Sequence, residues 1–98
     1  MDLIAPRGHL PLGSHAYRTI GPFDAESLPA GLRAEHRLKA GTWGLLDLTQ
    51  GSLRFVWDDD RGGAEALNAP ARLVVPPQVL HHVESDGPFA LSIAFHRL

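Results

Sequence analysis

The chain has 98 residues, which suffices for one domain with a single core. Hydrophobic residues make up 44% and charged residues 20%, and a formal net charge of -2 offers no electrostatic attraction to a nucleic-acid backbone. The absence of cysteine excludes disulfides, thiolate nucleophiles and sulfur-ligated metals, so a metal site would need nitrogen and oxygen ligands, for which six histidines are available.

The first residues, MDLIAPRGHLPLG, lack the basic start and apolar stretch of a signal peptide. No apolar run reaches the roughly 18 to 20 residues of a membrane-spanning helix. We therefore expect a cytoplasmic protein with neither a membrane nor a nucleic acid as partner. Residues 1–16 are predicted to form an extended arm that packs on the domain, residues 17–98, or on a second subunit.

The frequent glycines and prolines divide the chain into short segments that favour strands over helices. The first predicted strand covers residues 15–23 (HAYRTIGPF) and lies at the edge of the sheet. The second covers residues 31–38 (GLRAEHRL) and precedes a turn at residues 40–41.

Residues 43–48 and 53–57 follow as two further strands, the second with Leu53, Phe55 and Trp57 in period two. The residues between them, TQGS at 49–52, contain a glycine that suits a tight hairpin turn. The sequence therefore predicts a hairpin here, as in a meander or a barrel.

Residues 58–65 (DDDRGGAE) are charged and glycine-rich, which indicates a solvated loop. Their spacing does not match a calcium-binding EF-hand loop. Residues 73–75 form another predicted strand, which stops at Pro76 and Pro77 because proline cannot donate to a ladder.

The last predicted strand, residues 89–95, alternates large apolar residues with small or polar ones. Six or more short strands without a convincing helix predict an all-β sandwich or barrel. In such folds the inward side chains of facing strands converge on one interior.

His36 and His81 are the residues from which we expect chemistry. They lie on separate predicted strands, and imidazoles held by opposed rigid strands suit a transition-metal site. The alternative is that both are hydrogen-bonded pocket residues without a metal. In the segment PPQVLHHVE, alternation sends His82 to the face opposite His81.

Two motifs resemble the TehB/YeaR-like family of small cupins, which is named for tellurite-resistance proteins. The first is His36-x-x-Lys39-x-Gly41-x-Trp43-Gly44, and the second is Pro-Pro-x-x-x-His81-x-x-Glu84. The resemblance covers roughly residues 17–98. It implies a single-domain cupin, a double-stranded β-helix or jelly-roll barrel, commonly with a central metal.

The general cupin pattern Pro-x-Gly-x-x-His places a metal ligand at His81, with Gln78 where the pattern has glycine. The resemblance thus implies His36 and His81 as metal ligands, with Glu84 as the candidate third. Alternation places Glu84 opposite His81, so a surface glutamate paired with His82 or an arginine is an equal alternative. Leu38 stands where many cupins carry a second histidine.

Three further residues are candidates for ligand binding. Lys39 offers a positive charge for a small anion, Trp43 an aromatic wall and Gln78 an amide, while a solvated lysine, a core tryptophan and a turn-capping glutamine are the alternatives.

We therefore expect a homodimeric cupin that binds a divalent transition metal (zinc, iron, nickel or manganese) and a small anion or metabolite, with a link to tellurite or oxyanion stress. The alternatives are a metal-dependent enzyme of the dioxygenase or isomerase type, against which the incomplete histidine set argues, and a metal-free dimeric binding module.

Overall fold

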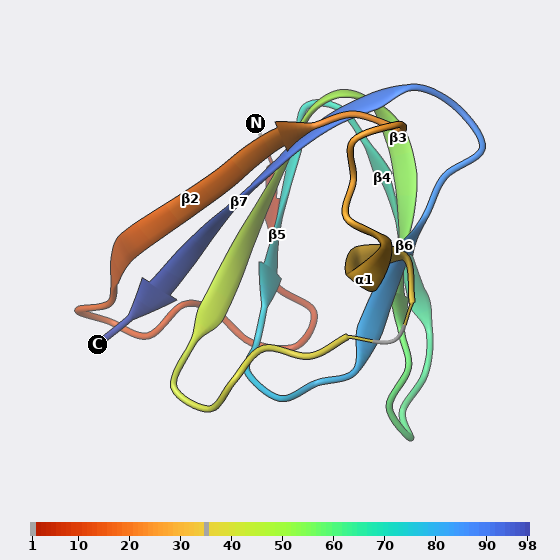
Figure 1. Cartoon of the computed structure of the whole chain (residues 1–98). Coiled ribbons are helices and arrows are strands. Elements are labelled where there is room, and N and C mark those ends of the chain that lie inside the picture. The colour runs from red at the N-terminus through yellow and green to blue at the C-terminus, as the bar shows by residue number, and fades with distance from the viewer. Residues whose placement is uncertain (1, 35) are drawn as a thin grey trace.

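The structure, a computed structural model, describes residues 2–34 and 36–98 and is all-β apart from one short helix, as the sequence predicted (Figure 1). The elements in chain order are β1 (Asp2–Ile4), β2 (His15–Phe23), α1 (Ala30–Arg33), β3 (Trp43–Trp57), β4 (Ala64–Asn68), β5 (Ala71–Val75), β6 (His81–Glu84) and β7 (Phe89–Arg97). No helix in the described part of the chain has the length and apolar character needed to cross a bilayer.

The long strand β3 organises the sheet. Its first part lies between β5 and β7 in the order β1-β5-β3-β7-β2, which we call the five-stranded half. Its second part pairs with β4 and β6, which we call the three-stranded half. Figure 1 shows the two halves diverging, with α1 beside the space between them. Within residues 2–34 and 36–98 the strand pairing does not close into a barrel.

The hairpin predicted at residues 49–52 is wrong, because β3 runs through this segment without reversing direction. Gly51 adopts φ 76, the left-handed conformation that also suited it to a turn. Its carbonyl accepts a hydrogen bond of 2.9 Å from the backbone N–H of Ala69, and its backbone pairs with Phe89. The glycine therefore marks a bend at the transition between the two halves.

A β-bulge accompanies this bend. Leu48 pairs with Leu91 and Gln50 with Ala90, so Thr49 is an extra residue on β3. Before the bulge the buried positions of β3 are even-numbered and after it they are odd-numbered. The inserted residue therefore keeps the apolar face of both halves turned toward the core.

The strand predicted at residues 31–38 is also wrong in its described part, residues 31–34 and 36–38, while residue 35 lies outside the described residues. The chain forms the single helical turn α1, preceded by a turn in which Asp24 Oδ1 accepts hydrogen bonds from the backbones of Glu26 and Ser27. A strand is stable only beside a partner, and the β-type pairing described for this segment is a bridge at His36.

Other predicted elements are confirmed. β2 lies at the edge of the sheet, β5 ends at Val75 immediately before the proline pair, and β7 buries Phe89 and Leu91. The segment at 58–65 is a loop as far as Gly63, after which β4 begins. The buried core is formed by side chains from both halves and from the segment before α1, among them Leu28, Leu46, Leu48, Leu53, Phe55, Trp57, Leu67, Leu73, Val83 and Leu91.

The N-terminal segment lies on its own domain. β1 pairs in parallel with β5, and Arg7 reaches the loop between β3 and β4. Its guanidinium donates to both carboxylate oxygens of Asp59, at 2.5 and 2.8 Å, and to the carbonyl of Gly62 at 3.1 Å. This pairing holds the pKa of Asp59 below its usual value.

Candidate functional site

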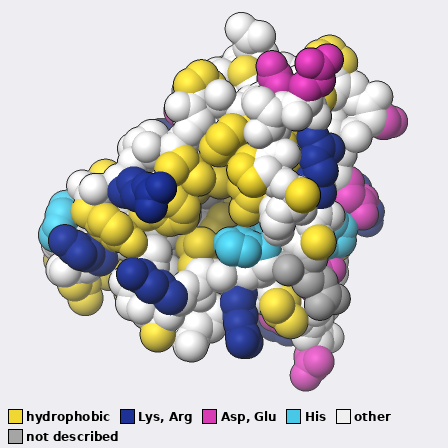
Figure 2. Space-filling model, viewed as in Figure 1, with side chains coloured by type: hydrophobic (Ala, Val, Ile, Leu, Met, Phe, Trp, Pro, Cys, Tyr) yellow, Lys and Arg dark blue, Asp and Glu magenta, His cyan; other side chains and the backbone are white. Residues whose placement is uncertain are grey.

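A small cavity of about 30 Å³ lies between the two halves of the sheet. It is lined by Leu32, His36, Leu38, Gly44, Leu46, Phe55, Val75, His81, Val83, Ile93 and Phe95. Figure 2 shows a hollow lined by hydrophobic side chains with a histidine at its margin, and Lys and Arg side chains around its mouth. The interior is apolar and the surrounding surface is basic.

His36 and His81, far apart in the sequence, meet at this cavity. Each backbone N–H donates to the other residue's carbonyl at 2.8 Å, which forms a short antiparallel bridge. Their rings lie 5.5 Å apart between centroids, nearly perpendicular at 82°. The two imidazoles predicted to work together are therefore brought together by backbone pairing.

The ring of His81 is held on two sides. Its Nδ1 lies 2.8 Å from the carbonyl of Val79, and because a carbonyl only accepts, Nδ1 carries the hydrogen and Nε2 keeps its lone pair. The ring stacks on Phe55 with centroids 4.9 Å apart. Burial in this apolar setting lowers the pKa of His81 to about 4, so the ring is neutral near pH 7.

These features fit a metal ligand in part. A neutral imidazole whose second nitrogen is fixed by a carbonyl is the usual form of a metal-binding histidine. In the described ranges, however, no group of three or more histidine, aspartate or glutamate side chains is placed to hold a metal. His36 and His81 could thus supply two ligands, and the other positions would fall to water or to a bound molecule.

Glu84, the candidate third ligand, lies on the opposite face of β6. It is 50% exposed and pairs with Arg54 at 3.0 Å and with Nε2 of His82 at 2.7 Å. These partners, His82 first, hold the pKa of Glu84 below its usual value. The structure therefore separates Glu84 from the histidine pair, as alternation along the strand predicts.

His82 forms a surface cluster with two carboxylates. Its Nδ1 lies 2.7 Å from Asp58, in addition to the contact of Nε2 with Glu84. The hydrogen bond to Glu84, and then that to Asp58, raise the pKa of His82. The adjacent residues His81 and His82 thus have pKa values shifted in opposite directions. The shift favours the neutral ring in His81 and the charged ring in His82.

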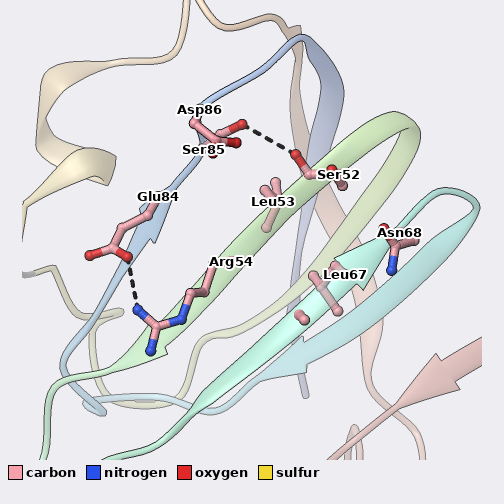
Figure 3. A pocket seen from close by; sticks show the side chains of 9 residues that line it. Ser52, Leu53, Arg54, Leu67, Asn68, Glu84, Ser85 and Asp86 are labelled. Carbon is pink, nitrogen blue, oxygen red and sulfur yellow. Dashed lines mark hydrogen bonds and ion pairs between the residues drawn. The ribbon is translucent and has the colours of Figure 1, made fainter.

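A larger groove of about 450 Å³ lies on the three-stranded half, around Arg54 and Glu84. Figure 3 shows these two side chains directed at each other and Ser85 directed at Ser52. The groove is open to solvent and Arg54 and Glu84 neutralise each other in it, so it lacks the enclosure expected of a small-molecule site. We therefore take the smaller cavity as the candidate site.

The three predicted ligand-binding residues lie outside the set of side chains that line the cavity. Lys39 is exposed, Trp43 is half-buried and pairs with His96 across to β7, and Gln78 is exposed. The backbone N–H of Gln78 donates to the carbonyl of Leu38 at 2.8 Å, which secures the turn before His81. Their ligand-binding roles stay predictions.

The apolar lining was missed by sequence reasoning. Phe55, Val83 and Phe95 are at alternating positions of their strands that face the interior, so the alternation of apolar residues could have identified them. Leu32 belongs to the helix α1, which was not predicted from the sequence. Asp58 pairs with His82 through the register of β3 against β6, which the sequence does not reveal.

Comparison with known proteins identifies a family whose model matches this chain. The family model described as the TehB-like domain matches residues 18–93. A search of curated proteins gives no match.

Solved structures share the fold, among them the following two. A crystal structure of TehB from Haemophilus influenzae superposes with a TM-score of 0.77 at 24% identity, covering 86% of this chain and 31% of that one. A protein from E. coli strain K12 has a TM-score of 0.77 at 20% identity, covering 90% and 94%. The chain thus spans about a third of the length of TehB and nearly all of the E. coli protein.

Proposed function

Because the chain belongs to the TehB-like domain family, which is related to tellurite resistance, we propose that it is a small-molecule-binding domain that acts in a response to tellurite or related oxyanions. The binding site is the cavity between the two halves of the sheet. His36 and His81 hold a divalent transition metal at its polar end, with zinc, iron, nickel or manganese as candidates.

The bridge between His36 and His81 is the observation that supports this proposal. It fixes two imidazoles at one cavity, and the contact of Nδ1 of His81 with Val79 leaves Nε2 available. A metal bound there would supply a Lewis acid able to hold an anionic or carbonyl oxygen. The basic side chains around the hollow in Figure 2 would attract such an anion.

The proposal includes the cupin form of the fold. The two halves that enclose the histidine pair would correspond to the walls of a double-stranded β-helix, open at the side where α1 lies. The proposal further includes a cytoplasmic location and a homodimer; the edge strand β2 leaves one sheet edge on which a second copy would pair.

Metal content of protein purified without chelator tests the site, followed by isothermal titration of zinc into wild type and variants. We expect His36→Ala and His81→Ala each to weaken zinc binding by about tenfold or more, since a two-ligand site cannot spare one ligand. His82→Ala, the matched control one residue away on the opposite face, should bind zinc as the wild type does. Equal affinity in all four proteins would contradict the metal site.

An enzymatic role of the dioxygenase or isomerase type is the second candidate. The apolar cavity favours it because a reaction there would be shielded from water, whereas the two-histidine ligand set does not. Oxygen uptake by the iron-loaded protein above the background of His81→Ala would support it. A metal-free dimeric binding module is the remaining alternative, which the zinc titration distinguishes.

A further inference from the structure

We propose that in the metal-free protein the cavity binds a neutral small molecule with a compact apolar body and a single polar group, in preference to an anion of the same shape. This inference rests on the proposed function in that the cavity is the binding site, but it does not require a metal.

The lining of the cavity carries the argument. Of the eleven described residues that form it, nine are aliphatic, aromatic or glycine, and the other two are His36 and His81. No described side chain in this lining is a lysine, arginine, aspartate or glutamate. A carboxylate or oxyanion that entered would lose its hydration without gaining a lysine or arginine partner, which is strongly unfavourable.

At the polar end of the cavity, His81 offers one hydrogen-bond acceptor. The Nδ1 hydrogen of His81 is used by the carbonyl of Val79, so Nε2 is the remaining acceptor of that ring. An amide N–H or a hydroxyl of a ligand can donate to it. An anion has no hydrogen to donate and would meet the lone pair of Nε2.

The basic side chains around the hollow do not offset this cost. Lys39, which the sequence suggested as the anion-binding group, is exposed and is not among the lining residues. The charge of Lys39 is solvated. It therefore attracts an approaching anion but contributes little to the free energy of an anion bound inside the cavity.

The dimensions set the size of the ligand. A space of about 30 Å³ has room for about two water-sized groups, so a ligand with a branched body enters only if one wall moves. One wall is formed by Leu32 of α1. α1 is a single turn without a side-chain cap and without a fully buried residue. This wall is therefore the part of the cavity best able to yield to a branched ligand.

Isobutyramide and isobutyrate form a matched pair of probes, because they have the same branched body and differ in charge. Each is titrated at neutral pH with a chelator present, and binding is followed through the methyl resonances of the lining residues Leu38, Leu46 and Ile93. We expect isobutyramide to bind about tenfold or more tightly than isobutyrate.

The variant Gly44→Ala tests whether isobutyramide binds in this cavity. A Cβ at Gly44 would contact three lining side chains, at 3.2 Å from Leu38 Cδ1, 3.6 Å from Val75 Cβ and 3.7 Å from Ile93 Cγ2. The tightest contact is the end of a flexible side chain, so the fold accommodates the methyl group while the cavity shrinks. Gly87→Ala, where a Cβ meets nothing within 4 Å, is the control.

We expect Gly44→Ala to weaken isobutyramide binding by about tenfold and Gly87→Ala to leave it unchanged. Equal or tighter binding of isobutyrate, binding of isobutyramide that Gly44→Ala does not alter, or no binding of either probe would each overturn the proposal. Because the titration excludes metal, failure of zinc binding at His36 and His81 would leave this result standing, and the reverse also holds.

Discussion

The guanidinium carbon of Arg7 lies 4.7 Å from the centre of the Trp57 ring, while the same guanidinium binds Asp59 through two hydrogen bonds. Only 7% of the Arg7 side chain is exposed. Trp57 in turn packs on Phe55, with ring centroids 4.7 Å apart, and Phe55 packs on His81. A line of contacting side chains thus connects the N-terminal segment to the candidate site.

Arg7→Ala should destabilise the domain by more than Asp59→Asn does. The alanine variant loses the packing on Trp57, the hydrogen bond to Gly62 and the pairing with Asp59, whereas the asparagine variant loses only the charge of the pair. Thermal unfolding should show a decrease of about 5 to 10 °C for Arg7→Ala. If the two variants melted together, the contact with Trp57 would contribute nothing measurable.

Replacing Gln78 with glycine should stabilise the protein. Gln78 follows Pro77 with φ 65, the left-handed conformation in which a non-glycine residue costs about 1 to 2 kcal/mol. Glycine avoids that cost but gains freedom in the unfolded chain, so the net gain should be about 1 kcal/mol. Urea denaturation measures it, with Gln78→Ala as the control because alanine keeps the Cβ. A loss of stability in the glycine variant would show that the amide side chain makes a stabilising contact.

Gly51→Ala and Gly41→Ala separate backbone conformation from steric overlap. Both glycines have nearly the same φ, 76 and 78. A Cβ at Gly51 would lie 2.0 Å from the carbonyl oxygen of Pro88, which is backbone, whereas at Gly41 it meets nothing within 4 Å. Gly41→Ala should therefore cost about 1 kcal/mol, and Gly51→Ala several times more or prevent folding. Equal stabilities in urea denaturation would mean that β3 and the loop before β7 can separate without cost.

The two adjacent histidines should act oppositely on stability as pH changes. An unfolded histidine titrates near 6.5, whereas folded His81 titrates at about 4, so the unfolded state binds more protons between these values. Stability from His81 is therefore lost as pH falls from about 6.5 to about 4, by on the order of 3 kcal/mol. The raised pKa of His82 works the other way: its stabilisation is complete below about 6.5 and is lost as pH rises through its folded pKa.

His82→Gln isolates these contributions. Relative to the wild type, it should lose more stability at pH 5.5 than at pH 8.5, because the charged ring between Asp58 and Glu84 is absent. Urea unfolding at the two pH values measures the difference. A loss that is the same at both values would show that His82 has the same pKa in the folded and unfolded states.

The sequence could predict the strands whose alternation is local, such as β7, and the opposite orientation of His81 and Glu84. It misplaced the hairpin because a glycine with positive φ suits a turn and also suits the bend that Gly51 forms within β3. The distinguishing signal is the change of phase between Leu46 and Leu48 on one side and Leu53 and Phe55 on the other. The pairing of His82 with Asp58 depends on the register of two distant strands, which no local pattern encodes.

The cavity, too, could be predicted from the sequence only in part. The two histidines were expected to meet because their motifs resemble a known family, but the absence of charge from the described lining emerges only when Leu32, Val75 and Phe95 are seen to converge. The charged residues that the sequence suggested as ligand groups lie outside it.

The bulge at Thr49 makes the length of β3 a stricter requirement than its composition. Deleting this single residue would move every following side chain of the strand to the opposite face, exposing Leu53, Phe55 and Trp57 and turning Ser52 and Arg54 inward. Homologous chains should therefore tolerate substitutions along residues 43–57 far more readily than insertions or deletions, which are expected to collect in the loops on either side.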